Sequence, residues 1–448
     1  MSLGSKIAKW LPLLPPIVGS AVFIHHNDRF FSNVPFLDEW SQVSLWSSQK
    51  SHLLTFSQLW QQHNQNRMLI PNLIYLASVE FIRKPDIFLQ YFTNILVIIS
   101  LIVLCFQITI NSNLKKVSEI FRVSLVTITL TTIILSFDEY ENLLWSFQDA
   151  WTLIFLAIII AAVTETRENK LKLKRTMFCL EVAIAIMASI SSIQGLLVWI
   201  IPIYSEIGEF RSTKTERNQK ILLASLTLLA AAITTGLYFH NFDLANGMNN
   251  SPGNNGLVAV TKYFLELFAA PFSLQVGSTL SFGLGLVIVA LSTYISILGI
   301  LNTDYKLAGS LAAVAIAFAV MTSIGRYHLG IESAASSRYS LYMLLPATSA
   351  ITAANVASSE RRSRATVKTN RSIPKLAVSI LAIVISLAMF RSDVKSIPNF
   401  NSTYQNRTAL IALINKYPNI SDASIQSEIY PSAPYVKPLL LLIKNHQL

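Results

Sequence analysis

The sequence predicts an all-α fold, a polytopic transmembrane helical bundle, from three observations. Of the 448 residues, 52% are hydrophobic and only 13% are charged, whereas soluble domains carry about 25% charged residues. The mean hydropathy is +0.49. Apolar runs nearly free of charge recur from residue 10 to residue 390, and about 20 such residues make one transmembrane helix. A transmembrane barrel would show short segments of alternating polarity instead, so that class is excluded.

The apolar runs give about eleven spans, starting from a cytoplasmic N-terminus. They lie at 10–26, 87–111, 122–136, 149–164, 176–192, 195–207, 220–239, 277–300, 306–324, 339–357 and 374–390. Two shorter apolar pieces, 68–82 and 260–272, each contain a glutamate and are predicted as juxtamembrane helices on the outer surface. The chain therefore divides into a transmembrane domain at 1–390, with its first outer loop at 27–86, and an extracytoplasmic tail at 391–448. That tail is too short for a sizeable core of its own.

The positions of Lys and Arg decide the orientation of this bundle. Basic residues gather in the loops predicted inside, at 112–122, 167–175, 211–220 and 361–375, whereas the outer loop 137–148 holds none. Because cytoplasmic loops carry an excess of Lys and Arg, the tail is predicted outside. These loops also explain the excess of 35 Lys and Arg over 24 Asp and Glu. Membrane lipids are therefore expected partners, and nucleic acid is not.

The first unusual polar cluster is the stretch FLDEW, which follows the first span and contains the adjacent acids Asp38 and Glu39. Neighbouring residues on a helix point about 100° apart, so one of the two acids is expected to face a given cavity. We favour Asp38. The alternative is an ordinary solvated acidic loop.

The stretch HNQNR at 63–67 places His63, Asn66 and Arg67 on one predicted helical face, at spacings i, i+3 and i+4. Two neutral hydrogen-bonding groups and a cation suit a sugar hydroxyl or a phosphate oxygen. A solvated surface helix explains the pattern equally well. His63 has no second histidine at ligand spacing, so the sequence leaves a metal site unknown.

The stretch FDEYENLLWSFQD predicts a polar and aromatic stripe that runs down one membrane helix. The stripe consists of Glu141, Asn142, Trp145, Gln148 and Asp149. Polar groups facing lipid are costly, so the stripe is expected to face the bundle interior or a wet cleft. Asp138 and Glu139 lie at its mouth. Capping of a helix N-terminus would explain those two acids, but not the lower part of the stripe.

A third outer stretch, GRYHLGIESAASSRY, forms an outward basic cluster. Its candidate ligand-binding residues are Arg326, His328, Arg338 and Tyr339. A planar guanidinium fits phosphate well, and anchoring to lipid headgroups is the alternative. Gln194 stands in a tight outer turn beside Gly195, where it either binds substrate or satisfies carbonyls at the helix end.

The layout of roughly the first 200 residues resembles the GT-C superfamily of polyprenyl-phosphate-dependent glycosyltransferases. The shared features are a cytosolic start, one span, a large outer loop that opens with FLDEW, and a second acidic outer loop with FDEYEN. The blocks HNQNRMLIPNLIYL, ENLLWSFQ and QGLLVW are also similar to a set in uncharacterised bacterial membrane proteins of this type. The resemblance implies a bacterial inner-membrane enzyme of the cell envelope. Such an enzyme moves a sugar from a polyprenyl-phosphate-linked donor to a glycan, lipid or protein acceptor outside.

The resemblance also implies roles for single residues. Asp38, or its neighbour Glu39, would be the base, and Glu139 or Asp138 its second-loop partner. Phosphate clamping by arginines of the third stretch is an inference from charge. No cofactor is implied, although a divalent cation is left open. The alternatives are a transporter or flippase for lipid-linked glycans and an O-antigen polymerase or ligase-like protein. The acids concentrated in the first two outer loops favour the transferase.

Overall fold

The computed structural model describes residues 8–166, 171–209, 214–243, 256–359 and 375–446. Within these residues the chain is helical throughout, apart from turns and two strands of two residues each. Eight of the described helical segments are long and apolar enough to cross a membrane: Pro85–Asn111, Val117–Leu144, Ser146–Thr164, Ile221–Phe239, Thr279–Leu301, Thr303–Leu329, Ser337–Ser358 and Leu376–Lys416. The predicted all-α class is confirmed, and the protein is a multi-pass integral membrane protein. The count of eleven spans stays a prediction.

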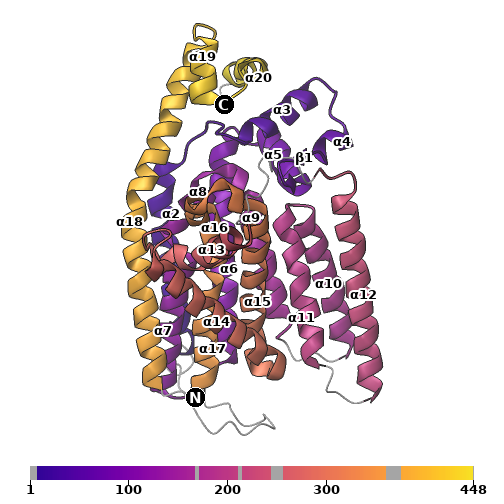
Figure 1. Ribbon diagram of the computed structural model, residues 1–448, viewed down its shortest axis with the longest axis vertical. Coiled ribbons are helices and arrows are strands. Elements are labelled where there is room, and N and C mark those ends of the chain that lie inside the picture. Colours follow the sequence, from indigo (N-terminus) through magenta and orange to yellow (C-terminus); the bar gives the residue numbers. More distant parts are fainter. Residues whose placement is uncertain (1–7, 167–170, 210–213, 244–255, 360–374, 447–448) are drawn as a thin grey trace.

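A central bundle carries most of these spans (Figure 1). It consists of α6 (Pro85–Asn111), α7 (Val117–Ile134), α9 (Asp149–Thr164), α14 (Thr279–Leu301), α15 (Lys306–Arg326), α17 (Leu345–Ser358) and the first half of α18 (Lys375–Lys416). Helix α6 packs against α7 and α9, α15 packs against α14 and α17, and α18 packs against α7. Their facing sides bury one apolar core that includes Leu101, Phe155 and Phe318. Helices suit these runs because lipid offers no hydrogen bonds to an open backbone.

Further, shorter elements complete the bundle, some at its ends and some packed along its sides. They are η1 (Ala8–Leu13), α2 (Leu14–Asn27), η2 (Asp28–Phe30), η3 (Phe137–Glu139), α8 (Tyr140–Leu144), η4 (Ser146–Gln148), α13 (Gly256–Ala269), η6 (Ala270–Phe272), η7 (Thr303–Tyr305), η8 (Tyr327–Leu329), η9 (Ile331–Ala335) and α16 (Ser337–Met343). The piece predicted on the outer surface at 260–272 falls in α13 and η6. Helix α13 packs against α14 and α15, and Leu267 and Phe268 in it are buried.

A second group of helices stands beside the bundle, at the right of Figure 1. It contains α10 (Leu171–Ser189), η5 (Ile193–Trp199), α11 (Ile200–Glu209) and α12 (Lys214–Phe239). The segments predicted as spans at 10–26, 176–192 and 195–207 form the shorter helices α2, α10 and η5–α11. The predicted basic loops at 167–175, 211–220 and 361–375 lie partly outside the described residues.

A small domain, which we name the outer domain after the predicted orientation, caps one end of the bundle at the top of Figure 1. It is built from α3 (Glu39–Lys50), α4 (Phe56–Leu59), β1 (Gln62–His63), β2 (Asn66–Arg67), α5 (Leu69–Phe81), the end of α18, α19 (Asp422–Ser424), the π-helical turn η10 (Ile425–Ile429) and α20 (Ala433–His446). The boundary predicted at 390 falls inside α18, which is continuous over 42 residues. Trp40, Trp46 and Tyr75 of the first loop share one core with Ile425 and Leu440 of the tail. The tail is too short for a core of its own, so it completes one with the first loop.

Candidate functional site

The two acids of the first loop point in different directions. Helix α3 begins at Glu39, and Asp38 is the residue before it. The Glu39 side chain is fully buried, whereas 33% of the Asp38 side chain is exposed. This is the divergence expected for adjacent residues at a helix start. Asp38 is therefore the acid that solvent or a ligand can reach.

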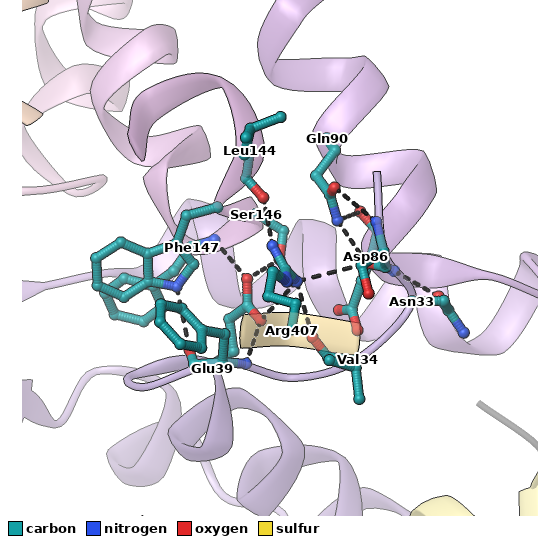
Figure 2. A network of polar contacts seen from close by, with 12 residues as sticks. Asn33, Val34, Glu39, Asp86, Gln90, Leu144, Ser146, Phe147 and Arg407 are labelled. Carbon is teal, nitrogen blue, oxygen red and sulfur yellow. Dashed lines mark hydrogen bonds and ion pairs between the residues drawn. The ribbon is translucent and has the colours of Figure 1, made fainter. Parts of the chain in front are cut away.

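Glu39 holds three segments of the chain together (Figure 2). Its Oε2 accepts hydrogen bonds from the Phe36 amide at 2.6 Å and from Nη2 of Arg407 at 3.4 Å. Its Oε1 accepts from the Ser146 hydroxyl and from the Phe147 amide. Burial raises the pKa of Glu39, while Arg407 and these hydrogen bonds act in the opposite direction. The contacts of Glu39 are those of a structural anchor between the first loop, the second loop and α18.

Arg407 is the fully buried cation of this network, and sequence reasoning did not select it. Its Nη2 donates to the Val34 carbonyl at 2.7 Å, and its Nη1 donates to the Leu144 carbonyl. It also lies close enough to Asp86 to act on that carboxyl group electrostatically. Figure 2 shows the guanidinium between Glu39 and Asp86. No local pattern around residue 407 indicates this role, because its partners come from segments more than 260 residues away.

The stretch HNQNR forms a β-hairpin, so the predicted helical face is wrong. Strands β1 and β2 pair antiparallel, with His63 opposite Asn66 and Gln62 opposite Arg67. Asn64 in the turn has a φ of 52°, which asparagine tolerates better than most residues. A five-residue pattern fits either structure, and contacts to distant segments favour the hairpin.

His63 and Asp38 are brought together by this hairpin. The Nε2 atom of His63 lies 3.2 Å from Oδ1 of Asp38, and 27% of the His63 side chain is exposed. The His63 ring contacts the Phe147 ring edge-on at 5.5 Å between centroids. The Asp38 carboxylate also acts on Tyr430 of the tail: burial, the neighbouring Tyr435 and Asp38, in that order, raise the pKa of Tyr430. The sequence predicted the acid and the histidine separately, and it gave no sign of Phe147 or Tyr430.

Arg67 is occupied by the end of α12. Its guanidinium donates to the carbonyls of Tyr238 at 2.8 Å and His240 at 2.7 Å, and it packs over the Trp60 ring. Only 5% of Arg67 is exposed. A cation that binds the carbonyls of a helix C-terminus is a stabilising cap. The geometry therefore gives Arg67 a structural position instead of the predicted contact with substrate.

Asn66 joins the hairpin to the turn that contains Gln194. The Oδ1 atom of Asn66 accepts from the Ser192 hydroxyl at 2.6 Å, and Ser192 also bonds to Oε1 of Gln194. Gln194 is nearly buried. Asn66 and Gln194 therefore both contact the hydroxyl group of Ser192.

Replacement of Gly195 by alanine is expected to cost about 3 kcal/mol of stability or more. An added Cβ would lie 1.8 Å from the Ala188 carbonyl oxygen, and backbone atoms cannot move aside as a side chain can. Thermal unfolding in detergent measures the loss. Gly283→Ala is the matched control, because the structure places nothing within 4 Å of a Cβ there. Equal unfolding temperatures for the two variants would contradict a close approach between Gly195 and the Ala188 carbonyl.

The predicted continuous stripe from Glu141 to Asp149 is broken. Helix α8 ends at Leu144, Trp145 is extended, and α9 starts at Asp149. The backbone groups freed by the break have partners from elsewhere: Asn94 donates to the Leu143 carbonyl at 2.9 Å, Arg407 donates to that of Leu144, and the Phe147 amide donates to Glu39. Because these backbone groups have hydrogen-bond partners, the break in the helix leaves none of them unpaired away from water.

The break turns the aromatic residues of the second loop toward the first and third outer stretches. Nε1 of Trp145 donates to the Phe36 carbonyl at 3.1 Å, and the Trp145 and Phe147 rings stack at 5.8 Å. The Arg338 guanidinium lies 5.7 Å from the centre of the Trp145 ring, which is cation–π distance. Arg338 is also 3.4 Å from a carboxylate oxygen of Glu141 and remains 35% exposed.

Glu141 and Asn142 hold the third outer stretch in place. Glu141 accepts from the hydroxyls of Ser336 and Ser337, both at 2.9 Å, and from the Arg338 amide at 3.1 Å. The Asn142 side chain donates to the Arg338 carbonyl at 3.2 Å. The predicted acidic and basic clusters are therefore adjacent, and Glu141 and Asn142 position Arg338.

The second-loop acids Asp138 and Glu139 have other neighbours than Asp38, and Asp138 contacts α16 and α18. Asp138 accepts from the hydroxyls of Ser396 at 2.9 Å and Ser340 at 3.2 Å. Glu139 is fully buried, and its hydrogen-bonding neighbour is the Asn142 side chain. Within the described residues no hydrogen bond or ion pair joins Asp38 to Glu139. The implied partnership of these acids remains a prediction, without a contact to support it.

The remaining predicted residues lie apart from Asp38 or below the surface. Tyr339 is buried against Trp151 and Phe318. Arg326 and His328 are half-buried at the end of α15, and His328 contacts Tyr327 edge-on. Gln148 is buried, and its Oε1 has no partner among the described residues.

Five residues thus form a continuous line of contacts, which we name the outer row after the predicted orientation: Asp38, His63, Phe147, Trp145 and Arg338. The row has an acid and an imidazole at one end, two aromatic rings in the middle and a guanidinium at the other end. Trp145 and Phe147 are only 4% and 6% exposed, so the rings link the two ends of the row from below the surface. The exposed ends can accept a proton and hold an anion. Among the described residues, no group of three or more His, Cys, Asp or Glu is arranged to hold a metal ion.

Comparison of the chain with protein-family models, with curated proteins and with solved structures gives no match.

Proposed function

We propose that the protein is a membrane glycosyltransferase that moves a sugar from a polyprenyl-phosphate donor to a glycan, lipid or protein acceptor outside the cytoplasm. The outer row carries this proposal, because its two ends are a carboxylate and a guanidinium that are each about a third exposed, joined by two nearly buried aromatic rings. The likeness of FLDEW and FDEYEN to the GT-C superfamily supports the same class.

The proposal includes a topology. The chain crosses a bacterial inner membrane about eleven times, with its N-terminus in the cytoplasm and its tail outside. The first-loop helices α3, α4 and α5 then lie on the outer surface. The distribution of Lys and Arg supports this orientation.

Each part of the outer row has one role in the proposed reaction. Asp38 accepts the proton of the acceptor hydroxyl as that oxygen attacks the anomeric carbon. His63 holds the carboxylate in place. Trp145 and Phe147 are nearly buried between the two ends of the row and hold Asp38, His63 and Arg338 in their relative positions. Arg338 binds the phosphate that leaves with the lipid, and its partner Glu141 keeps the guanidinium in position.

Sugar transfer by purified protein in lipid nanodiscs tests this function. The assay follows the loss of label from polyprenyl-phosphate hexoses and pentoses in the presence of a cell-envelope acceptor extract. We expect Arg338→Ala to lower the rate about 100-fold, because one charge-stabilising donor is lost. Arg29→Ala is the matched control, since Arg29 is exposed in the first outer loop and bonds only to His25 among the described residues. Wild-type protein that consumes none of these donors would contradict the proposed function.

Transport of a lipid-linked glycan is the second candidate, favoured by one observation. Glu139 and Asp149 are fully buried at or within spans, and among the described residues no ion pair neutralises either carboxylate. Ionisable groups at such positions are costly and often mark a translocation path. Movement of a fluorescent lipid-linked glycan across vesicle membranes without sugar transfer would favour this function over the transferase.

A further inference from the structure

A hollow of about 370 Å³ opens at the end of the bundle opposite to the outer domain. It lies between η1 and the C-terminal end of α6, and its polar lining comes from Lys9, Thr109, Ser112, Asn113 and Lys115. The topology of the chain puts this end on the side that the Lys and Arg distribution predicts to be cytoplasmic. It is separate from the outer row, and the proposed reaction does not use it.

The hollow is positively charged. Its lining includes two lysines and no acid. In the described part of the chain, neither Lys9 nor Lys115 forms an ion pair, whereas the nearby Arg122 is paired with Glu119 at 2.7 Å. The lysines are also not needed to cap α6, because Ser112 donates to the carbonyls of Ile108 and Thr109 through its hydroxyl and its amide. Two ammonium groups are therefore available to an anion.

Apolar side chains border the hollow on the side toward the membrane. Trp10 is 54% exposed, and its ring stacks on that of Phe106 at 6.3 Å. Phe106 and Ile110 are also exposed, on the same helix α6. Tryptophan is enriched at membrane–water interfaces, where an apolar ring and a polar edge are both accommodated. The cationic part of the hollow and this apolar surface together match an amphiphile better than a free anion.

We infer that the hollow binds the phosphodiester headgroup of an anionic phospholipid. In this site Lys9 and Lys115 contact the phosphate. Asn113 and Thr109 line the same hollow and can hydrogen-bond to hydroxyl groups of the headgroup. The acyl chains lie along Trp10 and Phe106. Basic pockets beside transmembrane helices on the cytoplasmic side are suited to such headgroups. The site is independent of whether the outer row transfers sugar.

Native mass spectrometry of the full chain in detergent, titrated with phosphatidylglycerol or phosphatidylcholine of equal chain length, tests this site. We expect phosphatidylglycerol to bind more tightly. Lys9→Gln and Lys115→Gln should each weaken its binding about fivefold, and the two together about 25-fold. Lys116→Gln is the matched control, because it removes the same charge from the adjacent residue, which does not line the hollow. Its effect should stay below about twofold.

Three results would overturn the inference. The first is equal affinity for the two lipids, and the second is an equal loss of binding in Lys115→Gln and Lys116→Gln. The third is displacement of phosphatidylglycerol by inorganic phosphate at a similar concentration, which would show a site for the free anion. The unfolding temperature of each variant is measured as well. A variant that unfolds at the same temperature as the wild type has lost lipid binding without losing its fold.

Discussion

Arg407→Met is expected to destabilise the protein by about 3–5 kcal/mol, because it leaves the buried Glu39 carboxylate without its cation. The same substitution removes donors from the carbonyls of Val34 and Leu144. Methionine keeps much of the side-chain volume, so the loss reports the charge and the hydrogen bonds. Thermal or denaturant unfolding in detergent measures it.

A surface ion pair provides the control for this prediction. Lys437 and Asp422 are 2.6 Å apart, with 38% and 58% of their side chains exposed. Exposed pairs contribute about 0–1 kcal/mol, so Lys437→Met should have a small effect. Equal losses for Arg407→Met and Lys437→Met would contradict the anchoring role of the buried pair.

The destabilisation caused by Arg407→Met should also depend on pH and on Glu39. Burial already raises the pKa of Glu39 from its ordinary value of 4.5, and Arg407 opposes that rise. Without Arg407 the folded state binds the Glu39 proton more tightly than the unfolded state does. The stability of the variant therefore falls as the pH rises above 4.5 and recovers as the pH is lowered toward it. Arg407→Met/Glu39→Gln should be more stable near neutral pH than Arg407→Met alone.

The long spans could be predicted from the sequence because their cause is local. Each run such as 87–111 or 277–300 is apolar over its whole length. In lipid, a single segment satisfies its backbone hydrogen bonds only by forming a helix. The structure places long helices at Pro85–Asn111 and Thr279–Leu301 accordingly. Shorter runs such as 195–207 do not settle the count, since about a dozen apolar residues can form a buried helix as well as a short span.

The candidate site could be predicted in composition but not in geometry. Asp38, His63, Trp145 and Arg338 were selected as unusual outer polar or aromatic residues, and the structure joins them in the outer row. The links that join them are not local. The turn at Asn64 and the helix break at Trp145 both depend on partners from other segments, so periodicity of three or four residues misplaced both.

The role of Arg407 shows the same limit more clearly. The break at Trp145 is possible because the Leu144 carbonyl receives a hydrogen bond from Arg407, 263 residues further along the chain. A pattern over a few neighbouring residues cannot predict such a contact. Glu39 was selected for its acidity, which is correct chemistry for a base, but its burial and its four donors fit an anchor better.

Asp38→Asn is expected to lower sugar transfer about 100- to 10,000-fold, because a neutral amide cannot accept the proton of the acceptor hydroxyl. The fold should be unaffected, since Asp38 is a third exposed and its side chain does not cap α3. Single-turnover transfer from a polyprenyl-phosphate sugar in nanodiscs measures the loss. Asp28→Asn is the matched control, because Asp28 is a half-buried acid at the start of the same loop and lies outside the outer row.

Substitution of His63, alone and together with Asp38→Asn, tests whether the two side chains act together in catalysis. If the two side chains act as a unit, His63→Phe should lower the rate in the wild-type background and have little further effect in Asp38→Asn. If the two side chains contributed independently, the fold-reductions in rate of the single variants would multiply in the double variant. Full turnover by Asp38→Asn, in a preparation whose wild type is active, would leave the transferase in place and remove Asp38 as its base. Inactive wild type with every donor would instead remove the transferase itself, so the two failures are separate results.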